Sequence, residues 1–349
     1  MRTADEIQIA IISLSFHGTM TRILITGGAG YVGSHCARAI AEAGYKAVVF
    51  DNLIFGHRDF VRWGKLIEGD IRDPDALDAV FRADRFDAVM HFAALAYVGE
   101  SVSDPGRYYD VNVHGTRVLL DAMMRAGVRS VVFSSSCALY GEPTHMPISE
   151  NAKLDPINPY GFTKLVCERM MDDFEHAHGL KSARLRYFNA AGAEPTAEIG
   201  EDHDPETHLI PLVLDVALGI RPEIRIFGTD YPTPDGTALR DYIHVCDLAR
   251  AHVLALSHLL HHRETIAVNL GSGQGISVRQ VIETVQDVTG RPIRAKQSAR
   301  RPGDPAELVA DPRKAREVLD WSAERSSLKT IIADAWRWHT LRFGRNGPM

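Results

Sequence analysis

The sequence predicts an α/β protein: a Rossmann-type doubly wound parallel sheet followed by a smaller C-terminal domain. Short apolar runs of strand length alternate with segments of helical periodicity from residue 22 to residue 188. This alternation is typical of a parallel sheet covered by helices on both faces. A glycine-rich turn follows the first apolar run. After residue 189 the alternation weakens and Pro, Gly and Asp become frequent, so we expect a second domain there.

The expected elements follow from the apolar runs and their boundaries. Strands are predicted at 23–26, 47–50, 66–70, 88–92, 131–134 and 184–188. Helices are predicted over 32–43, 104–126 and 160–178. Asp73-Pro74 begins another helix, because Asp is a good N-cap and Pro suits the first helical turn. Two later stretches, 241–260 and the strand 267–270, are candidates to return to the first domain.

Composition limits the class of protein. The chain has 349 residues, 45 % hydrophobic and 24 % charged, which is ordinary for a soluble globular protein. Its net charge of −6 argues against nucleic acid as a partner. The four cysteines form no C-x-x-C pair, which argues against disulfides and a zinc site and favours a reducing, cytoplasmic location.

The chain shows no membrane segment and no complete set of metal ligands. The apolar run 7–16 is too short to span a bilayer, and residues 1–20 are predicted to be an N-terminal extension. His258, His261 and His262 cluster near a helix end, but no carboxylate or cysteine completes a ligand set with them. A solvated polar helix end is the preferred interpretation, and we expect no metal site.

The glycine-rich turn has the spacing G-x-x-G-x-x-G, with glycines at 27, 30 and 33 between the first strand and the first helix. Such a turn lets the backbone approach a pyrophosphate, and the helix N-terminus adds N–H groups and partial positive charge. Asp51 ends the second strand, 18 residues beyond Gly33. A carboxylate there can accept both ribose hydroxyls and would repel a 2′-phosphate, which favours NAD over NADP.

Two further strand ends suit the same cofactor. Asp70-Ile71 ends the third strand, where a carboxylate and an aliphatic wall fit adenine. Phe92-Ala93-Ala94 ends the fourth strand, at the carboxyl edge where ligands sit in open α/β sheets. Ordinary strand termini are the alternative interpretation for both segments.

A tyrosine, a lysine and a serine suggest the chemistry. Tyr160 and Lys164 stand at i and i+4, so a helix places them on one face. A free tyrosine has a pKa near ~10, and a neighbouring ammonium favours the phenolate that a base requires. Ser134-Ser135-Ser136 ends the fifth strand at the same carboxyl edge. A serine there can hydrogen-bond the substrate hydroxyl that loses its proton.

Taken together, these motifs resemble the extended short-chain dehydrogenase/reductase family, and within it the UDP-glucose 4-epimerases. The resemblance covers residues 21–338. Its most specific segments are 26–35, 51–53, 91–94, 98–101, 134–141, 159–164, 186–189 and 240–245. It implies Ser136 as the catalytic serine, Tyr160 as the base and Lys164 as its partner, with NAD bound throughout turnover.

The expected ligand contacts combine the residues above with those that the resemblance adds. For NAD they are Gly27, Gly30, Tyr31, Val32, Gly33, Asp51, Asn52, Asp70, Ile71, Phe92, Ala93, Ala94, Asn112, Tyr160, Lys164 and Tyr187. For the sugar nucleotide they are Ser136, Tyr160, Asn189, His208, Leu209, Arg225, Phe227, Arg240, Arg301, Asp304 and Leu308. The family has Asn where His208 stands, and some epimerases carry a lysine at Ala96.

The resemblance also implies a domain plan and an assembly. Residues 21–189 would be the NAD-binding Rossmann domain, and 190–349 the smaller substrate-binding domain, with parts of 241–273 returning to the first. Dimers would form through the helices after Asp104 and after Tyr160. The expected activity is interconversion of UDP-glucose and UDP-galactose through a 4-keto intermediate.

Other functions remain alternatives at this point. A 4,6-dehydratase carries Asp-Glu or Glu after the catalytic Ser or Thr, whereas this chain has Cys137 and Ala138. Another epimerase, a decarboxylase and a catalytically silent NAD-binding regulator are also open. Leu308, or Glu307 if the alignment slips by one residue, stands where epimerases confined to UDP-glucose and UDP-galactose often have tyrosine. Additional activity on UDP-GlcNAc is therefore a hypothesis.

Overall fold

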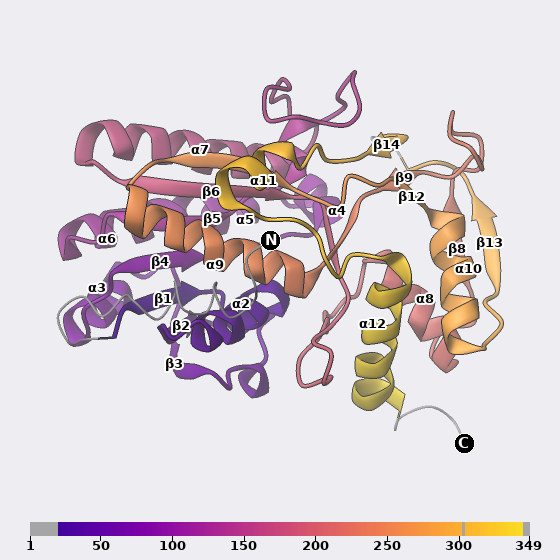
Figure 1. Ribbon diagram of the computed structural model, residues 1–349, viewed down its shortest axis with the longest axis horizontal. Helices are drawn as coiled ribbons and strands as arrows, with labels where there is room; N and C mark the ends of the chain where they lie inside the picture. The colour runs from indigo at the N-terminus through magenta and orange to yellow at the C-terminus, as the bar shows by residue number, and fades with distance from the viewer. Residues whose placement is uncertain (1–19, 302–303, 345–349) are drawn as a thin grey trace.

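A computed structural model describes residues 20–301 and 304–344 (Figure 1). The predicted extension lies outside the described residues except for Met20. A seven-stranded parallel sheet forms the larger part of the protein, in the order β11-β6-β5-β4-β1-β2-β3. Its strands are β1 (Arg22–Thr26), β2 (Lys46–Asp51), β3 (Gly64–Glu68), β4 (Ala88–His91), β5 (Ser130–Ser134), β6 (Lys181–Tyr187) and β11 (Ile266–Leu270). This arrangement confirms the predicted Rossmann-type fold.

Helices cover both faces of this sheet (Figure 1). One apolar core joins the sheet to α2 (Tyr31–Glu42), α9 (Val245–His262) and α11 (Arg313–Leu319). The core on the other face involves α3 (Pro74–Ala83), α6 (Gly115–Ala126) and α7 (Pro159–His178). β11 pairs with β6, and α9 packs against α2. Segments from beyond residue 190 therefore complete both the sheet and one of its helical layers.

The helix expected over 104–126 contains an irregular turn. Helical backbone runs through α5 (Pro105–Tyr108), the π-helical turn η2 (Tyr109–His114) and α6. Asp104 caps its start by accepting the backbone N–H of Arg107 at 3.3 Å. Asn112 in the π turn is buried, and its side-chain amide forms hydrogen bonds with the backbone N–H and carbonyl of Leu95. A separate short helix, α4 (Val98–Ser103), precedes this segment.

The remaining elements form a smaller lobe beside the carboxyl edge of the sheet, at the right of Figure 1. They include α8 (Leu209–Leu218), α10 (Val278–Thr289), α12 (Leu328–Phe343), and the parallel pair β8 (Ile224–Phe227) and β13 (Ala295–Ser298). The other short pairings are β7 (Asn189–Ala191) with β10 (Tyr242–His244), and β9 (Leu239–Arg240) with β12 (Ile276–Ser277) and β14 (Glu307–Leu308). Among the described residues, no helix is both long and apolar enough to cross a membrane.

Candidate active site

A cleft of about 1930 Å³ runs from the carboxyl edge of the sheet into the smaller lobe. Ligands of open α/β sheets bind where the strand order reverses, which here is between β1 and β4. All of the predicted substrate contacts line the cleft, and so do the predicted cofactor contacts apart from Asn112 and Lys164. Residues named from separate parts of the sequence therefore share one cavity.

The glycine turn lies at the start of α2 and each glycine has its own task. A Cβ on Gly33 would lie 2.2 Å from the carbonyl oxygen of Gly27, so this glycine permits close packing inside the turn. Gly27 has φ +72°, and its Cβ would lie 2.4 Å from the backbone nitrogen of Ala93. Only Gly30 is open, since its Cβ would meet a single atom, 3.5 Å away. Gly30 is the N-cap of α2 and provides no capping side chain, so an anion can reach the free N–H groups there.

Asp51 is held at the end of β2 by the backbone. One carboxylate oxygen accepts the N–H of Ala29 at 3.0 Å, and the other accepts that of Leu53 at 2.8 Å. Burial raises the pKa of Asp51 above its ordinary value, although these two bonds oppose the rise. Each oxygen still has acceptor capacity for a ribose hydroxyl. The open helix N-terminus and this carboxylate together fit NAD.

The carboxylate of Asp70, the expected adenine contact, is fixed by hydrogen bonds from two neighbouring side chains. Arg72 donates to both of its oxygens, at distances of 2.8–3.0 Å, and Asn52 donates to one of them at 3.0 Å. Hydrogen bonding from Arg72 is the largest cause that lowers the pKa of Asp70 to about 2. Beside it the buried Ile71 packs on Gly115, where a Cβ would lie 2.7 Å from its side chain. The carboxylate therefore stays ionised beside an aliphatic wall.

Ser136 and Tyr160 line the cleft, and Lys164 lies beneath them. α7 begins at Pro159 because Asn158 caps it by accepting the N–H of Gly161 at 2.8 Å. The ammonium of Lys164 donates to the Ser134 carbonyl at 2.7 Å and lies 5.9 Å from the ring centroid of Tyr160. Ser136 is the N-cap of the short helix η3 (Cys137–Tyr140), and its hydroxyl accepts the N–H of Ala138 at 3.1 Å. Lys164 is buried and acts from beneath the cleft, which explains why it does not line it.

Burial dominates the electrostatics of this group. It raises the pKa of Tyr160 well above the ordinary value, while a hydrogen bond with Ser136 acts to lower it. Burial also lowers the pKa of Lys164 to about 8. The phenolate therefore requires nearby positive charge, and the Lys164 ammonium provides it from within the chain.

The predicted nucleotide contacts are fixed in the smaller lobe. Arg240 donates to the carboxylate of Asp304 and, at 2.7 Å, to the carbonyl of Leu239. Arg301 stacks on Phe227, with its guanidinium carbon 4.0 Å from the ring centroid. Asp304 is thus paired with an arginine of the expected diphosphate clamp. The Arg301 guanidinium stacks on Phe227, the ring expected to meet the base.

Some predicted contacts act indirectly, and some cleft residues were not predicted. Asn112 accepts the N–H of Leu95 at 2.8 Å and donates to Thr163 at 3.0 Å, so its side chain braces a cleft segment and does not face the cavity. The cleft wall also contains Glu201, His203 and Glu206, which the sequence reading did not select. The sequence does contain a sign of this group, because residues 201–208 include two Glu and two His.

With this geometry established, comparison with known proteins is informative. The sequence pattern of the "NAD dependent epimerase/dehydratase family" matches residues 23–271. A UDP-glucose 4-epimerase of Rhizobium meliloti (strain 1021) is 51 % identical over 320 residues, covering 92 % of this chain and 97 % of that protein. The chain belongs to the NAD-dependent epimerase/dehydratase family.

Solved structures agree with this assignment. The UDP-glucose 4-epimerase of Brucella ovis in complex with NAD superposes with a TM-score of 0.89 at 50 % identity, covering 91 % of this chain and 98 % of that one. The enzyme of Bifidobacterium longum in complex with NAD⁺ and UDP gives a TM-score of 0.88 at 37 % identity, covering 93 % and 99 %. The predicted family and NAD cofactor are confirmed.

Proposed function

We propose that this family member is a UDP-glucose 4-epimerase, an isomerase that interconverts UDP-glucose and UDP-galactose. The observation that carries the proposal is the meeting of Ser136, Tyr160 and Lys164 at the point where the NAD half of the cleft joins the predicted nucleotide half. A serine, a tyrosine and a buried lysine in that place serve removal of a proton from a hydroxyl. The high identity to epimerases supports hydride transfer at C4.

The residues divide the reaction between them. NAD, when bound, supplies the acceptor and donor of the C4 hydride. Tyr160, as phenolate, accepts the proton of the 4-hydroxyl as the carbonyl forms, and it returns the proton when the carbonyl is reduced. Ser136 hydrogen-bonds the same oxygen, and the Lys164 ammonium stabilises the phenolate. No net oxidation results, so the cofactor does not need to exchange.

Inversion at C4 requires the 4-keto sugar to present both of its faces in turn. Binding must therefore reside in the nucleotide, away from the reacting carbon. Arg240, Arg301 and Phe227 supply that binding from the smaller lobe, because fixed guanidinium groups suit a diphosphate and an aromatic ring suits a base. Asn189, His208, Leu209 and Arg225 complete the same wall of the cleft.

A dehydratase is disfavoured by the cleft wall beside Ser136. The two following residues, Cys137 and Ala138, line the cavity and carry no carboxyl group. Burial raises the pKa of the Cys137 thiol to about 12, so it is not an acid at neutral pH. Elimination of water would lack its acid and base at this position.

The purified enzyme should convert UDP-glucose to UDP-galactose with no cofactor added. Denaturing the same sample should release NAD and not NADP, because Asp51 would repel a 2′-phosphate. Chromatography of the sugar nucleotides and of the released cofactor checks both statements. An absolute need for added NAD, or recovery of mostly NADP, would contradict the assignment.

Leu308 is expected to widen the sugar site. Leu308 lines the cleft and pairs with Arg240 across β14 and β9, whereas Glu307 does not line it, and this supports Leu308 as the residue beside the sugar. Its side chain lacks the phenol ring found in restricted epimerases, so we propose additional activity on UDP-GlcNAc. Leu308→Tyr should slow UDP-GlcNAc epimerisation by a steric penalty of roughly 1–3 kcal/mol and leave UDP-glucose turnover nearly unchanged. Parallel assays of both substrates check this, and equal slowing would refute it.

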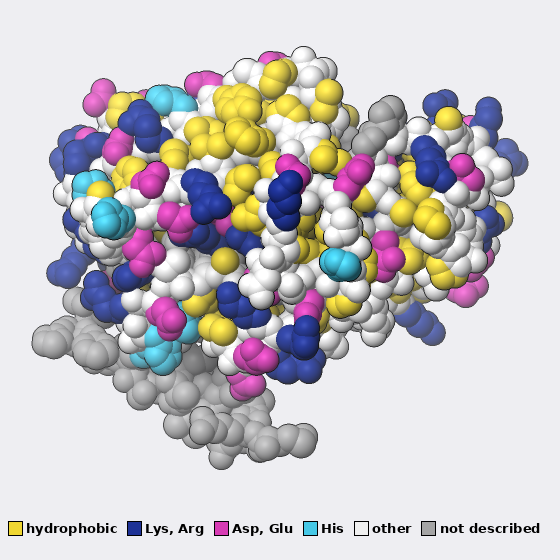
Figure 2. All heavy atoms as spheres, turned by 90° about the horizontal axis from the view of Figure 1, so that it is seen from above, with side chains coloured by type: hydrophobic (Ala, Val, Ile, Leu, Met, Phe, Trp, Pro, Cys, Tyr) yellow, Lys and Arg dark blue, Asp and Glu magenta, His cyan; other side chains and the backbone are white. Residues whose placement is uncertain are grey.

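We also propose that the enzyme is a cytoplasmic homodimer. Large exposed apolar side chains lie on α4, η2 and α7, namely Val98, Val102, Tyr109 and Phe162. The rings of Tyr109 and Phe162 are 6.4 Å apart, so two of these elements present one surface. Figure 2 shows hydrophobic side chains gathered on the face seen from above. Sedimentation of the enzyme should give twice the chain mass, and Phe162→Glu should reduce it.

A further inference from the structure

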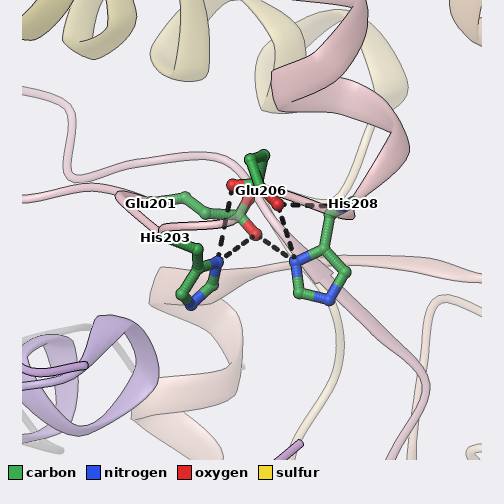
Figure 3. A group of neighbouring side chains, drawn as sticks. All are labelled: Glu201, His203, Glu206 and His208. Carbon is green, nitrogen blue, oxygen red and sulfur yellow. Dashed lines mark hydrogen bonds and ion pairs between the residues drawn. The ribbon is translucent and has the colours of Figure 1, made fainter. Parts of the chain in front are cut away.

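A cluster of two glutamates and two histidines lies in the wall of the cleft, in the segment that leads into α8 (Figure 3). Glu201, His203, Glu206 and His208 turn their polar atoms toward one another, and one ligand atom from each lies within 4.8 Å of all the others. None of these residues takes part in the proton transfer described above. Three of the four have no predicted role at all.

The separations between the histidine nitrogens and the carboxylate oxygens are close to those between zinc ligands. Tetrahedral zinc, with ligand distances of about 2.0–2.2 Å, holds neighbouring ligand atoms roughly 3.3–3.6 Å apart. Nδ1 of His203 lies 3.4 Å from a Glu201 oxygen and 3.5 Å from a Glu206 oxygen. Nδ1 of His208 lies 3.6 Å from the other Glu206 oxygen and 2.5 Å from the same Glu201 oxygen. Three of the four separations match, and the fourth would have to open by about 1 Å.

His203 has an unused nitrogen aimed at this centre. Its Nδ1 is buried and makes no hydrogen bond within the described part of the chain, although both carboxylates are near. The rings of Tyr31 and Tyr97 pack edge-on against the imidazole and hold it in place. The nitrogen lies in ion-pair range of both carboxylates but makes no hydrogen bond to either, and a cation between them would give it the partner that buried polar atoms nearly always have.

The carboxylates are also held in position by the backbone and by charge. Glu206 accepts the N–H groups of Thr207 and His208, at 2.7 Å and 2.8 Å. Burial acts to lower the pKa of His203, but the carboxylates of Glu201 and Glu206 outweigh it and raise the pKa to about 10. Glu201 and Glu206 likewise raise the pKa of His208 against the effect of burial. Two carboxylates and two imidazoles thus face one centre from fixed positions, as the ligands of one divalent cation do.

We propose that Glu201, His203, Glu206 and His208 form a binding site for one Zn²⁺-like divalent cation, which ties the 201–208 segment to the start of α8. Imidazole and carboxylate ligands in tetrahedral arrangement suit zinc, whereas Mg²⁺ prefers octahedral oxygen ligands. The site differs from the His258 to His262 group, whose side chains belong to no group of three or more metal-ligating residues among the described residues. It also revises the expectation, drawn from cysteine spacing, that the protein has no metal site.

Calorimetry of the full-length enzyme tests the proposal directly. The enzyme is treated with chelator, dialysed, and titrated with Zn²⁺ alone and then with Mg²⁺ alone. One saturable equivalent of Zn²⁺ per chain is expected. Mg²⁺ should give no saturable binding, and affinity for Zn²⁺ should rise with pH because the imidazoles must lose their protons.

Matched variants locate the site. His203→Gln and Glu206→Gln should each weaken Zn²⁺ binding at least tenfold, whereas His261→Gln, an exposed histidine on α9, should leave it unchanged. Binding of Co²⁺ by the unaltered enzyme is a second test, which does not require any variant to fold. Intense visible absorption bands would indicate four-coordinate Co²⁺. Absence of a saturable equivalent, binding that survives both cluster substitutions, or only weak octahedral Co²⁺ bands would each overturn the proposal.

Discussion

Tyr160→Phe is expected to lower kcat by a factor on the order of 10² to 10⁴, the usual contribution of a positioned proton-transfer group. The substitution removes only the hydroxyl, and the ring remains packed with Leu95 and Tyr108. Fold and retained NAD should therefore be unchanged. Because burial raises the pKa of Tyr160, its reactivity depends on the positive charge held close to it by Lys164.

Steady-state turnover of UDP-glucose by the purified variant, with bound cofactor measured on the same sample, checks this expectation. Tyr45→Phe is a matched control, because Tyr45 is a buried tyrosine that does not line the cleft. It should leave kcat close to that of the unaltered enzyme. Near-normal turnover by the Tyr160 variant would remove this residue from its role as base.

The glycine turn gives the second large effect, and two substitutions separate its two tasks. Gly33→Ala places a methyl group 2.2 Å from the Gly27 carbonyl oxygen, so the turn must shift. We expect a loss of stability of roughly 1–3 kcal/mol, as for other overpacked sites, together with loss of retained NAD. Gly30→Ala meets only one atom, at 3.5 Å, so the fold should persist while the methyl group blocks the pyrophosphate at the N-terminus of α2.

Thermal unfolding and the NAD content of the purified variants distinguish these outcomes. Gly30→Ala should unfold near the temperature of the unaltered protein stripped of cofactor, yet retain at least tenfold less NAD. Gly106→Ala provides a control, because Gly106 has no positive φ, its added Cβ would meet one atom at 4.0 Å, and it does not line the cleft. Full NAD retention by Gly30→Ala would show that the phosphate lies elsewhere.

Much of the first domain could be predicted because its signals are local. Buried parallel strands are continuous apolar runs, so 23–26 and 131–134 were recognisable as β1 and β5 without knowledge of the fold. Asp73 was predictable as a cap, and it accepts the N–H groups of Asp75 and Ala76. The resemblance to a known family pointed to residues of the smaller lobe, such as Arg240 and Asp304, that line the cleft and that periodicity alone would not have selected.

What could not be predicted depends on contacts between distant segments. The π turn at Tyr109–His114 is accompanied by bonds from Asn112 to Leu95 and Thr163, partners that no local pattern specifies. The pairing of Arg240 with Asp304 joins residues 64 positions apart. The cysteine spacing argued against a metal site, whereas the cluster around Glu201 consists of carboxylates and imidazoles that a bend at 204–205 brings together.

The central claim is that the hydrogen at C4 leaves the sugar and returns to it within one active site. UDP-glucose carrying deuterium at C4 tests this most directly, with enzyme in water and no cofactor added. The account predicts UDP-galactose that retains deuterium at C4 and acquires no solvent hydrogen on carbon. Product with solvent hydrogen at C4, or loss of the label when unlabelled NAD is added to a parallel sample, would contradict it.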